Sequence, residues 1–471
     1  MTSPTLAQDI GTFAVEHPYD ALPAEVIDSV RKRVLDILGI CLAASDLDTS
    51  AGVRAYAASQ GGRADAHAIG LRDALPASLA ALVNGTLAHS LDYDDTHLPS
   101  VLHPSASVIP AALAMAEAHQ RSGQELIAAI ACGLEVCVRL GMAGYDEKKG
   151  SSLFFENGQH ATSICGTLGA VVSTSLLAGF DAEQITHALG LAASMGSGVI
   201  EANRTGGSVK RMHCGWAAHA ACVATDLVHH GFTGPPTILE GRFGFFQAWL
   251  HGEFYPEWIT SELGVRWEVP GIFFKPYPAN HFTHTAIDAA AALRQRGIDL
   301  ESITHLELGV PASIVRTIGE PIETKRTPAT AYMAQFSGPY AVALGLFGGS
   351  GLGAGLADYT DELAKDPARR ALMAKVSVVS NDECSAIFPH QFPSVLRATL
   401  SSGEVIEEKA LSNLGGNEQP LTYEQLAVKF RDNAGRHLSA TSVRHVESLV
   451  STLETLTTLT PLFDALAFSA R

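Results

Sequence analysis

HATSICGTLGAVVSTSLLAG, residues 160–179, carries no charged side chain, and Gly, Ala, Ser and Thr fill much of it. A helix of this composition is apolar on most of its sides, so we expect it inside a closely packed core. No Lys or Arg flanks it closely, as would be typical of a membrane span. The stretch therefore predicts a buried helix at the centre of a helical domain.

The rest of the first half has the same character, and the pattern changes near residue 265. Apolar residues at helical spacing predict further helices at 22–45, 74–95, 103–120, 122–143, 181–199 and 213–231. Beyond the change, helices are predicted at 282–297 and 328–349, and strands at 303–311, 375–382 and 394–410. The last strand region holds a Ser-Gly turn between alternating runs, which is typical of a hairpin.

Two domains follow from this change, because 471 residues exceed one ordinary core. We predict a mainly α protein in which residues 1–268 and 411–471 form a large all-α helical domain. A smaller α+β lid domain, residues 269–410, is inserted between them. The glycine-rich segment 348–355 contains a GxGxxA match, but it follows a helix rather than a strand, so we expect a loop there.

The amino-acid composition argues against certain binding partners and indicates the cellular compartment. The net charge is −17, from 49 acidic and 32 basic residues, which disfavours binding to nucleic acid or to an anionic membrane surface. Seven scattered cysteines indicate buried thiols in a reducing compartment rather than a disulfide framework. The N-terminus shows no basic region followed by an apolar core, so no signal peptide is predicted. We therefore expect a cytoplasmic protein.

The segment HSLDYDDTHLPSVLHPSASVIP, residues 89–110, concentrates polar groups between two apolar helices. If the first helix continues, Asp92 and Thr96 lie one turn apart on the same face. Pro104 suits a first helical turn, which places His103 near the N-cap of the next helix. The positive end of the helix dipole lowers a histidine pKa and favours a neutral base, and Asp92 is positioned in sequence to orient it.

Two other interpretations of this segment remain open. One is a plain helix–loop–helix with capping aspartates. The other is a metal site, since carboxylates and imidazoles are both metal ligands, and the segment offers Asp92, Asp94, Asp95, His97 and His103. Their spacing matches no standard metal motif, so we predict neither a metal nor a cofactor.

Two further groups are predicted at helix starts. His160 precedes the small-residue helix, and Lys210 precedes the helix expected from His213. Helix N-termini bind anions through free N–H groups, so convergence of three such ends would give an acidic protein a locally positive pocket. Taken singly, His160 is equally a cap histidine and Lys210 a solvated charge.

Two candidates come from the second half. Lys275 lies between aromatic residues and prolines at the expected domain boundary, where clefts form, although a surface lysine on a rigid hinge fits equally. Tyr340 follows Pro339, which we expect to distort the surrounding helix. Most buried tyrosines serve in packing, so chemistry alone gives Tyr340 little weight.

The sequence resembles the MmgE/PrpD family, which includes 2-methylcitrate dehydratase, cis-aconitate decarboxylase and iminodisuccinate epimerase. Five blocks carry the resemblance in family order: HSLDYDDTH with HPSASVIPAALA, GTLGAV after His160, GGSVKRMHCGWAA, FKPYPANHFTHTAIDA and QFSGPYAVA. The resemblance implies a homodimer of helical and lid domains with a cofactor-free site in the cleft between them. The implied pocket residues are Asp92, Thr96, His103, His160, Lys210, Lys275 and Tyr340.

The resemblance implies acid/base chemistry on a small di- or tricarboxylic acid. We expect a hydro-lyase first, with a decarboxylase, an epimerase or an inactive small-acid binder as alternatives. His103 is the expected main acid or base with Asp92 orienting it, Lys210 and Lys275 bind carboxylates beside Thr96, and His160 or Tyr340 is the opposing proton donor. Some relatives have His or Cys where this chain has Asn280, which cannot transfer a proton but is able to bind substrate or cap a helix.

Overall fold

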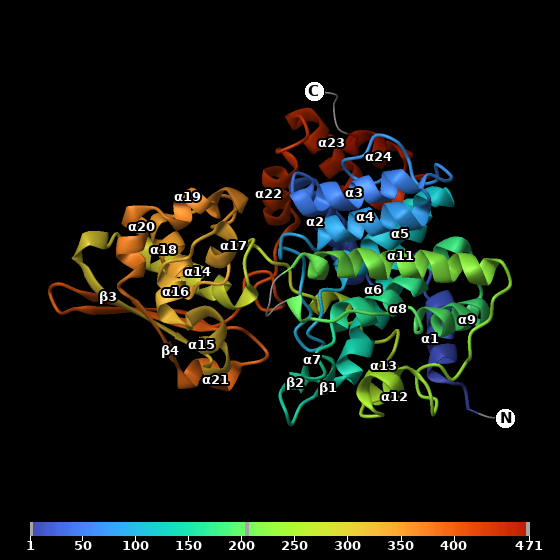
Figure 1. Ribbon diagram of the computed structural model, residues 1–471, viewed down its shortest axis with the longest axis horizontal. Coiled ribbons are helices and arrows are strands. Elements are labelled where there is room, and N and C mark those ends of the chain that lie inside the picture. Colours follow the sequence, from blue (N-terminus) through green and yellow to red (C-terminus); the bar gives the residue numbers. More distant parts are fainter. Residues whose placement is uncertain (1–2, 203–206, 468–471) are drawn as a thin grey trace. The chain divides into compact units, whose positions relative to one another are not determined.

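The computed structural model describes residues 3–202 and 207–467 (Figure 1). The chain divides into two compact units, which we call the first unit, Met1–Ile272 with Asn433–Arg471, and the second unit, Phe273–Asp432. Helices dominate both, so the protein is mainly α, as predicted. That the second unit acts as a lid stays a prediction.

The first unit is built from helices and one very short strand pair. Its helices are α1 (Leu6–Glu16), α2 (Ala24–Ala44), α3 (Asp48–Gln60), α4 (Ala77–Ala88), α5 (Ser105–Ala118), α6 (Gly123–Ala143), α7 (Leu153–Glu156), α8 (Ala161–Ala178), α9 (Ala182–Ala192), α11 (Val209–His229), α12 (Phe245–Leu250), α13 (Glu257–Thr260), α23 (Ala440–Ser451) and α24 (Thr460–Leu466). The strands β1 (Tyr145–Asp146) and β2 (Ser151–Ser152) pair antiparallel, and 3-10 turns η1 (Tyr19–Ala21), η2 (Val269–Gly271) and η6 (Leu453–Thr455) complete the unit.

Helix α8, the small-residue stretch, lies in the core of the first unit as predicted. It packs against α5, α6, α9 and α11, and α11 also packs along α4 (Figure 1). By length and apolar composition alone α6 and α8 would suffice to cross a bilayer, but their most apolar windows are 100% and 89% buried inside the structure. Both therefore serve as core helices.

Two glycines allow α4 and α11 to approach closely. A Cβ added at Gly85 would lie 2.8 Å from the Cα of Gly215, and one added at Gly215 would lie 2.3 Å from the carbonyl oxygen of Leu82. A side chain at either position would therefore push the two helices apart. This contact matters because α4 leads directly into the polar segment at residues 89–104.

The second unit holds the sheet and its covering helices. Its strands β3 (Ile303–Val310), β4 (Val376–Ser380), β5 (Ser394–Leu400) and β6 (Val405–Ala410) lie in the order β4-β3-β5-β6. Strand β4 pairs parallel to β3, whereas β5 pairs antiparallel to both β3 and β6, so the predicted hairpin is confirmed. The helices and 3-10 turns are η3 (His281–Thr283), α14 (His284–Gln295), η4 (Leu300–Ser302), α15 (Ala312–Gly319), α16 (Ile322–Arg326), α17 (Ala331–Ala334), α18 (Gly338–Phe347), η5 (Leu356–Asp358), α19 (Asp361–Ala364), α20 (Pro367–Met373), α21 (Asp382–Ile387) and α22 (Tyr423–Ala434).

The second unit ends at Asp432 rather than near residue 410, because α22 packs within it. Leu421 and Leu426 share a buried cluster with Phe274, and the Lys429 ammonium donates to the carbonyl of Lys275 at 2.9 Å. An amphipathic helix does not reveal from its pattern which unit its apolar face will cover.

Several predicted helices end elsewhere. The helix expected at 74–95 stops at Ala88, and the helix expected at 328–349 is divided into α17 and α18. Pro339 lies in the first turn of α18, so it begins a helix instead of distorting one. The glycine-rich segment is a loop as expected, and its backbone at Ser350 and Gly355 donates to the Asp358 carboxylate.

Candidate active site

The polar segment after α4 is irregular backbone, not the continued helix that the sequence suggested. Asp92 adopts a left-handed conformation with φ of 53°, which Asp tolerates better than most residues. Consequently Asp92 and Thr96 do not share a helical face. The buried side chains of Asp94 and Asp95 bond to partners instead, which replaces the regular helical bonding pattern.

Asp95 anchors this segment in the core. Its carboxylate accepts from the Arg33 guanidinium at 2.7 Å, and both side chains are almost fully buried. It also accepts from the backbone N–H and the hydroxyl of Ser105, the first residue of α5. Asp95 therefore ties the segment to a helix N-terminus, where a negative charge is stabilised.

His103 stands two residues before α5, next to the position predicted for it. Its Nδ1 lies 2.6 Å from the backbone carbonyl oxygen of Asp95 and 3.3 Å from the Thr96 hydroxyl. A carbonyl only accepts, so Nδ1 carries a proton and donates, which makes Nε2 the nitrogen available for proton transfer. The backbone N–H of His103 bonds to the hydroxyl of Thr162, in the first turn of α8, at 3.2 Å.

His89, the C-cap residue of α4, forms a buried ion pair with Asp94. Its Nδ1 lies 2.7 Å from the Asp94 carboxylate, and both side chains are at most 1% exposed. Burial alone would lower the pKa of His89, but the neighbouring Cys214 and the bonded carboxylate outweigh it and raise the pKa to about 10. The ion pair with Asp94 therefore favours the imidazolium form of His89.

His160 is the N-cap residue of α8, as the sequence predicted. Its backbone N–H donates to the carbonyl of Gly198 at 3.0 Å. Gly198 has φ of 156°, and a Cβ there would lie 3.0 Å from the Cβ of His160, so glycine is needed for this close approach. The Nδ1 atoms of His160 and His213 are 2.9 Å apart, which joins α8 to α11.

Both of these histidines are held neutral. Burial, together with the positive charges of His89 and Lys210, keeps the pKa of His160 well below its usual range. The same causes, burial first, lower the pKa of His213 to about 4. A neutral imidazole at a helix N-terminus acts as a hydrogen-bond donor toward developing negative charge.

Lys210 lies in the first turn of α11, which begins at Val209, four residues earlier than expected. Its ammonium is 3.9 Å from the Asp92 carboxylate, and the two side chains are 27% and 14% exposed. Asp92 was expected to orient His103. The structure places the Lys210 ammonium beside the Asp92 carboxylate, and the backbone carbonyl of Asp95 accepts from the ring of His103. An orienting role of Asp92 toward His103 stays a prediction.

The three helix N-termini meet, as the sequence suggested. The starts of α5 and α8 are joined by the bond from His103 to Thr162, and α8 and α11 by His160 and His213. Five of the predicted residues therefore lie together in the first unit, namely Asp92, Thr96, His103, His160 and Lys210. No role was predicted from the sequence for His89 or His213. Both lie near the ends of apolar helices and within the segments that resemble the family, which is the signal that marks them.

Lys275 and Tyr340 belong to the second unit. The Lys275 side chain is 1% exposed. The Tyr340 hydroxyl donates to the backbone carbonyl of Asp358 at 2.5 Å, and the Tyr340 ring contacts Tyr359 and the Arg369 guanidinium. Burial raises the pKa of Tyr340 to about 12. This environment favours packing over proton transfer.

Asn280 caps the 3-10 turn η3, one of the two roles that the sequence left open. Its side-chain oxygen accepts from the backbone N–H of Phe282 at 3.1 Å. Its own backbone N–H donates to the carbonyl of Gln335 at 3.0 Å. The capping role is therefore present, and a contact with substrate through the side-chain NH₂ stays a prediction.

Substitutions at Asn280 should separate capping from substrate binding. Asn280→Ala removes the cap and should destabilise the fold by about 1 kcal/mol, whereas Asn280→Asp keeps an acceptor oxygen and should not. We expect kcat of Asn280→Asp to stay within a few-fold of wild type, because Asn carries no transferable proton. Thermal unfolding and steady-state kinetics measure both. If Asn280→Asp is stable but ranks substrates differently from wild type, the NH₂ group of Asn280 contributes to specificity. If either variant binds substrate but does not turn it over, both roles are contradicted.

The metal alternative finds no geometric support. Within residues 3–202 and 207–467, no group of three or more His, Cys, Asp or Glu side chains is placed to hold a metal ion. Asp94 and Asp95 are each engaged by a cationic partner, His89 and Arg33 respectively.

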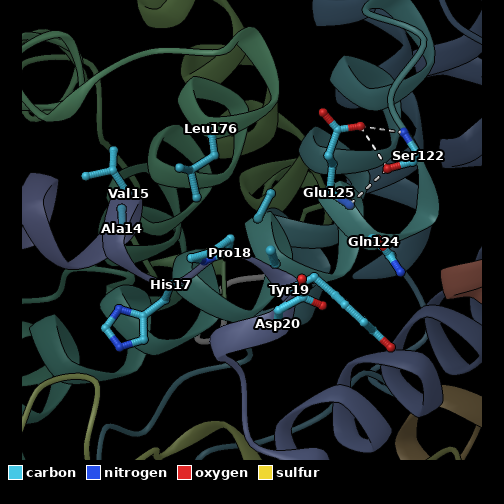
Figure 2. A pocket seen from close by; sticks show the side chains of 12 residues that line it. Ala14, Val15, His17, Pro18, Tyr19, Asp20, Ser122, Gln124, Glu125 and Leu176 are labelled. Atoms are coloured by element: carbon cyan, nitrogen blue, oxygen red, sulfur yellow. Dashed lines mark hydrogen bonds between the residues drawn. The ribbon is translucent and has the colours of Figure 1, made fainter.

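A separate surface pocket of about 300 Å³ lies where α1 and η1 meet α6 (Figure 2). Asp20 and Glu125 are among its lining residues, and no Lys or Arg is. The Glu125 carboxylate accepts hydrogen bonds from the backbone N–H and the hydroxyl of Ser122, the N-cap residue of α6. An acidic lining of this kind is unsuited to a carboxylate, so the cluster around His103 is the better candidate site.

Comparison with known proteins agrees with the resemblance. The MmgE/PrpD N-terminal domain model matches residues 8–257 and the C-terminal domain model matches residues 277–455. The cis-aconitate decarboxylase of Mus musculus is 28% identical over 438 residues, which cover 92% of this chain and 87% of that protein. The enzymes of the same name from Homo sapiens and Aspergillus terreus are 29% and 25% identical, over 81% and 95% of this chain and 78% and 93% of their own lengths. The chain belongs to the MmgE/PrpD family.

Proposed function

We propose that this protein is a lyase that decarboxylates cis-aconitate or a closely similar unsaturated tricarboxylic acid. The observation that carries the proposal is the convergence of His103, His160 and Lys210 at three helix N-termini, with the Nδ1 of His103 committed to a carbonyl. Relatives that cover nearly the whole chain bear the name cis-aconitate decarboxylase. That name favours decarboxylation over the dehydration that the sequence put first.

The proposed reaction needs one proton and no oxidant. The bond between the CH₂ carbon and its carboxylate breaks, and CO₂ leaves. The electron pair forms a new double bond to the central carbon, while the electrons of the original double bond move toward the remaining CH carbon and its carboxylate. That CH carbon then takes a proton, which gives an unsaturated dicarboxylate with a terminal CH₂ group. Catalysis therefore requires one proton donor and groups that stabilise charge on a carboxylate.

His103 is the proposed proton donor. Its Nδ1–H is held by the Asp95 carbonyl, which stabilises the imidazolium and leaves Nε2–H to protonate carbon. Binding of a multiply charged anion beside it raises the pKa of a histidine and favours this form. His160, kept neutral, donates a hydrogen bond to the carboxylate on which charge develops.

Lysines supply the positive charge in this proposal. Lys210 binds a substrate carboxylate, and Asp92 orients the ammonium. Lys275 binds a second carboxylate in line with the family resemblance. Because the Tyr340 ring is packed against Tyr359 and Arg369, we assign the second role in the reaction to His160 instead.

A substrate panel tests the function. Purified protein should release CO₂ from cis-aconitate, and in D₂O the product should carry one deuterium on carbon, detected by NMR. Hydroxy tricarboxylates and amino dicarboxylates are the comparison substrates. Loss of water from a hydroxy acid, without release of CO₂, would show a hydro-lyase instead. Inversion of an amino dicarboxylate would show an epimerase, and binding without turnover would show an inactive binding protein.

We predict that turnover survives removal of divalent metal. The motivation is that the carboxylates of the site are already paired with His89, Arg33 and Lys210. Dialysis against a strong chelator, followed by assay with and without added divalent ions, measures this. Lost activity that returns with one particular ion would overturn it.

Two finer expectations belong to the same proposal. We expect the cytoplasm as the compartment, because all seven cysteines are free and buried, which suits reducing conditions. We expect a homodimer, so sedimentation equilibrium should give about twice the chain mass of 49.6 kDa.

A further inference from the structure

Four histidines, each in or next to a different helix of the first unit, form a continuous row. The order is His103, His89, His160 and His213, and their ring centroids are 5.5, 5.6 and 4.9 Å apart in turn. His89 thus contacts both rings to which the proposed reaction assigns a role. It makes these contacts from the C-cap of α4, the helix that crosses α11 at the Gly85–Gly215 contact.

The ion pair of His89 with Asp94 is expected to contribute little to the stability of the fold. Both side chains are at most 1% exposed. Moving two charges out of water costs nearly as much as their attraction returns, so a buried pair is weak evidence for a stabilising role. Within a core of low dielectric constant, however, its charges act strongly on neighbouring rings.

We propose that the His89–Asp94 pair is a positioning element of the reaction, which spaces the rings of His103 and His160 and keeps His160 in its neutral, hydrogen-bond-donating form. The inference rests on the proposed function, because that function assigns the roles of the two outer rings. Next to burial, the positive charge of His89 is the main reason for the low pKa of His160, ahead of Lys210. His89 itself acts through its neighbours and transfers no proton to substrate.

Charged and titratable groups face this pair from every element packed around it. They are Asp95, which lies beside Asp94 and is itself paired with Arg33, His103 ahead of α5, His160 on α8, Lys210, His213 and Cys214 on α11, and Cys41 on α2, which lies near Asp94. Within the pair, Asp94 supplies the negative charge that favours the cationic form of His89. Removing either member of the pair should therefore change His160 in the same direction.

Nitrogen NMR of the full chain labelled with ¹⁵N-histidine tests the pair without any substrate. In wild type we expect His89 to be an imidazolium at pH 8 and His160 to be neutral at pH 6. In Asp94→Asn and His89→Gln, the pKa of His160 should rise by about one unit, because a nearby positive charge is lost. His219→Gln is the matched control, since His219 also bridges α11 and α4 through the Ser78 carbonyl but lies outside the row. A neutral His89 at pH 8, or an unchanged His160 titration in both pair variants, would overturn the proposal.

Kinetics with cis-aconitate test the consequence. His89→Gln should lower kcat roughly 10²-fold, as expected for misplaced reacting groups, with KM changed less than about threefold. A higher pKa means that His160 takes up its proton at higher pH, so the acid limb of the rate profile should move upward by about one pH unit. Substrate ionisation is common to both proteins and cancels in the comparison. His219→Gln should leave both quantities unchanged.

The two proposals fail in different ways. If wild type does not release CO₂ from cis-aconitate, the proposed function fails while the NMR titrations still decide the ion pair. If His89→Gln does not fold, Asp94→Asn keeps the ring in place and becomes the deciding variant. A folded Asp94→Asn with wild-type kcat and an unmoved acid limb would reduce the pair to a structural contact.

Discussion

His103→Ala should lose about 10²–10⁴-fold in kcat, the usual range for removal of a general acid or base. The ring of His103 is held through Nδ1 by the carbonyl of Asp95, so the imidazolium form donates its proton from Nε2. Removing the ring takes away the proposed proton donor but leaves intact the Asp95–Arg33 pair that anchors the segment. Steady-state kinetics on cis-aconitate, with circular dichroism and thermal unfolding to confirm the fold, measure the effect.

A second variant separates chemistry from packing at this position. His103→Gln retains a donor near the Asp95 carbonyl and much of the volume, but it cannot supply a proton at neutral pH. It should be as inactive as His103→Ala and bind a dicarboxylate inhibitor like wild type. A folded His103→Gln with near-normal kcat would remove His103 from the mechanism.

Lys210→Met should raise KM by about 10- to 150-fold, which corresponds to the roughly 1.5–3 kcal/mol of a hydrogen bond to a charged group. Lys210 is part-exposed in the first turn of α11, where its charge and the helix N-terminus both attract an anion. Met keeps most of the length and the apolar stem, so packing should change little.

Two companions complete this test. Lys275→Met should raise KM in the same way, because the family resemblance implies that Lys275 binds a second carboxylate of the substrate. Lys148→Met is the control, since Lys148 is an exposed lysine in a turn. Binding of a dicarboxylate inhibitor, measured by calorimetry at two salt concentrations, should weaken in the first two variants and stay normal in the third. Normal binding in both Lys210→Met and Lys275→Met would contradict the positive pocket.

Much of the site was predictable because helix ends have local sequence signals. Pro104 and the small-residue composition after His160 fix where α5 and α8 begin. The anion-binding property of a helix N-terminus then follows from unpaired N–H groups alone. The sequence therefore predicted that His103 and His160 stand at helix starts, and the structure places both there.

The interior of the site was not predictable in the same way. His89 and Asp94 are five residues apart, a spacing that neither a helix nor a strand brings together. Their contact depends on the segment after Ala88 leaving the helix, with Asp92 in a left-handed conformation. Propensity alone favoured a longer helix, and the buried polar pairs overrode it.

The sequence by itself determined the helical core, the sheet hairpin and which histidines stand at helix starts, because periodicity, turns and caps are properties of neighbouring residues. Only the tertiary structure decided that α22 packs with Phe274, that Asp92 pairs with Lys210, and that His89 lies between His103 and His160. The reason is physical: a buried charge selects whichever opposite charge the packing brings near, and packing of distant helices leaves no mark on local spacing.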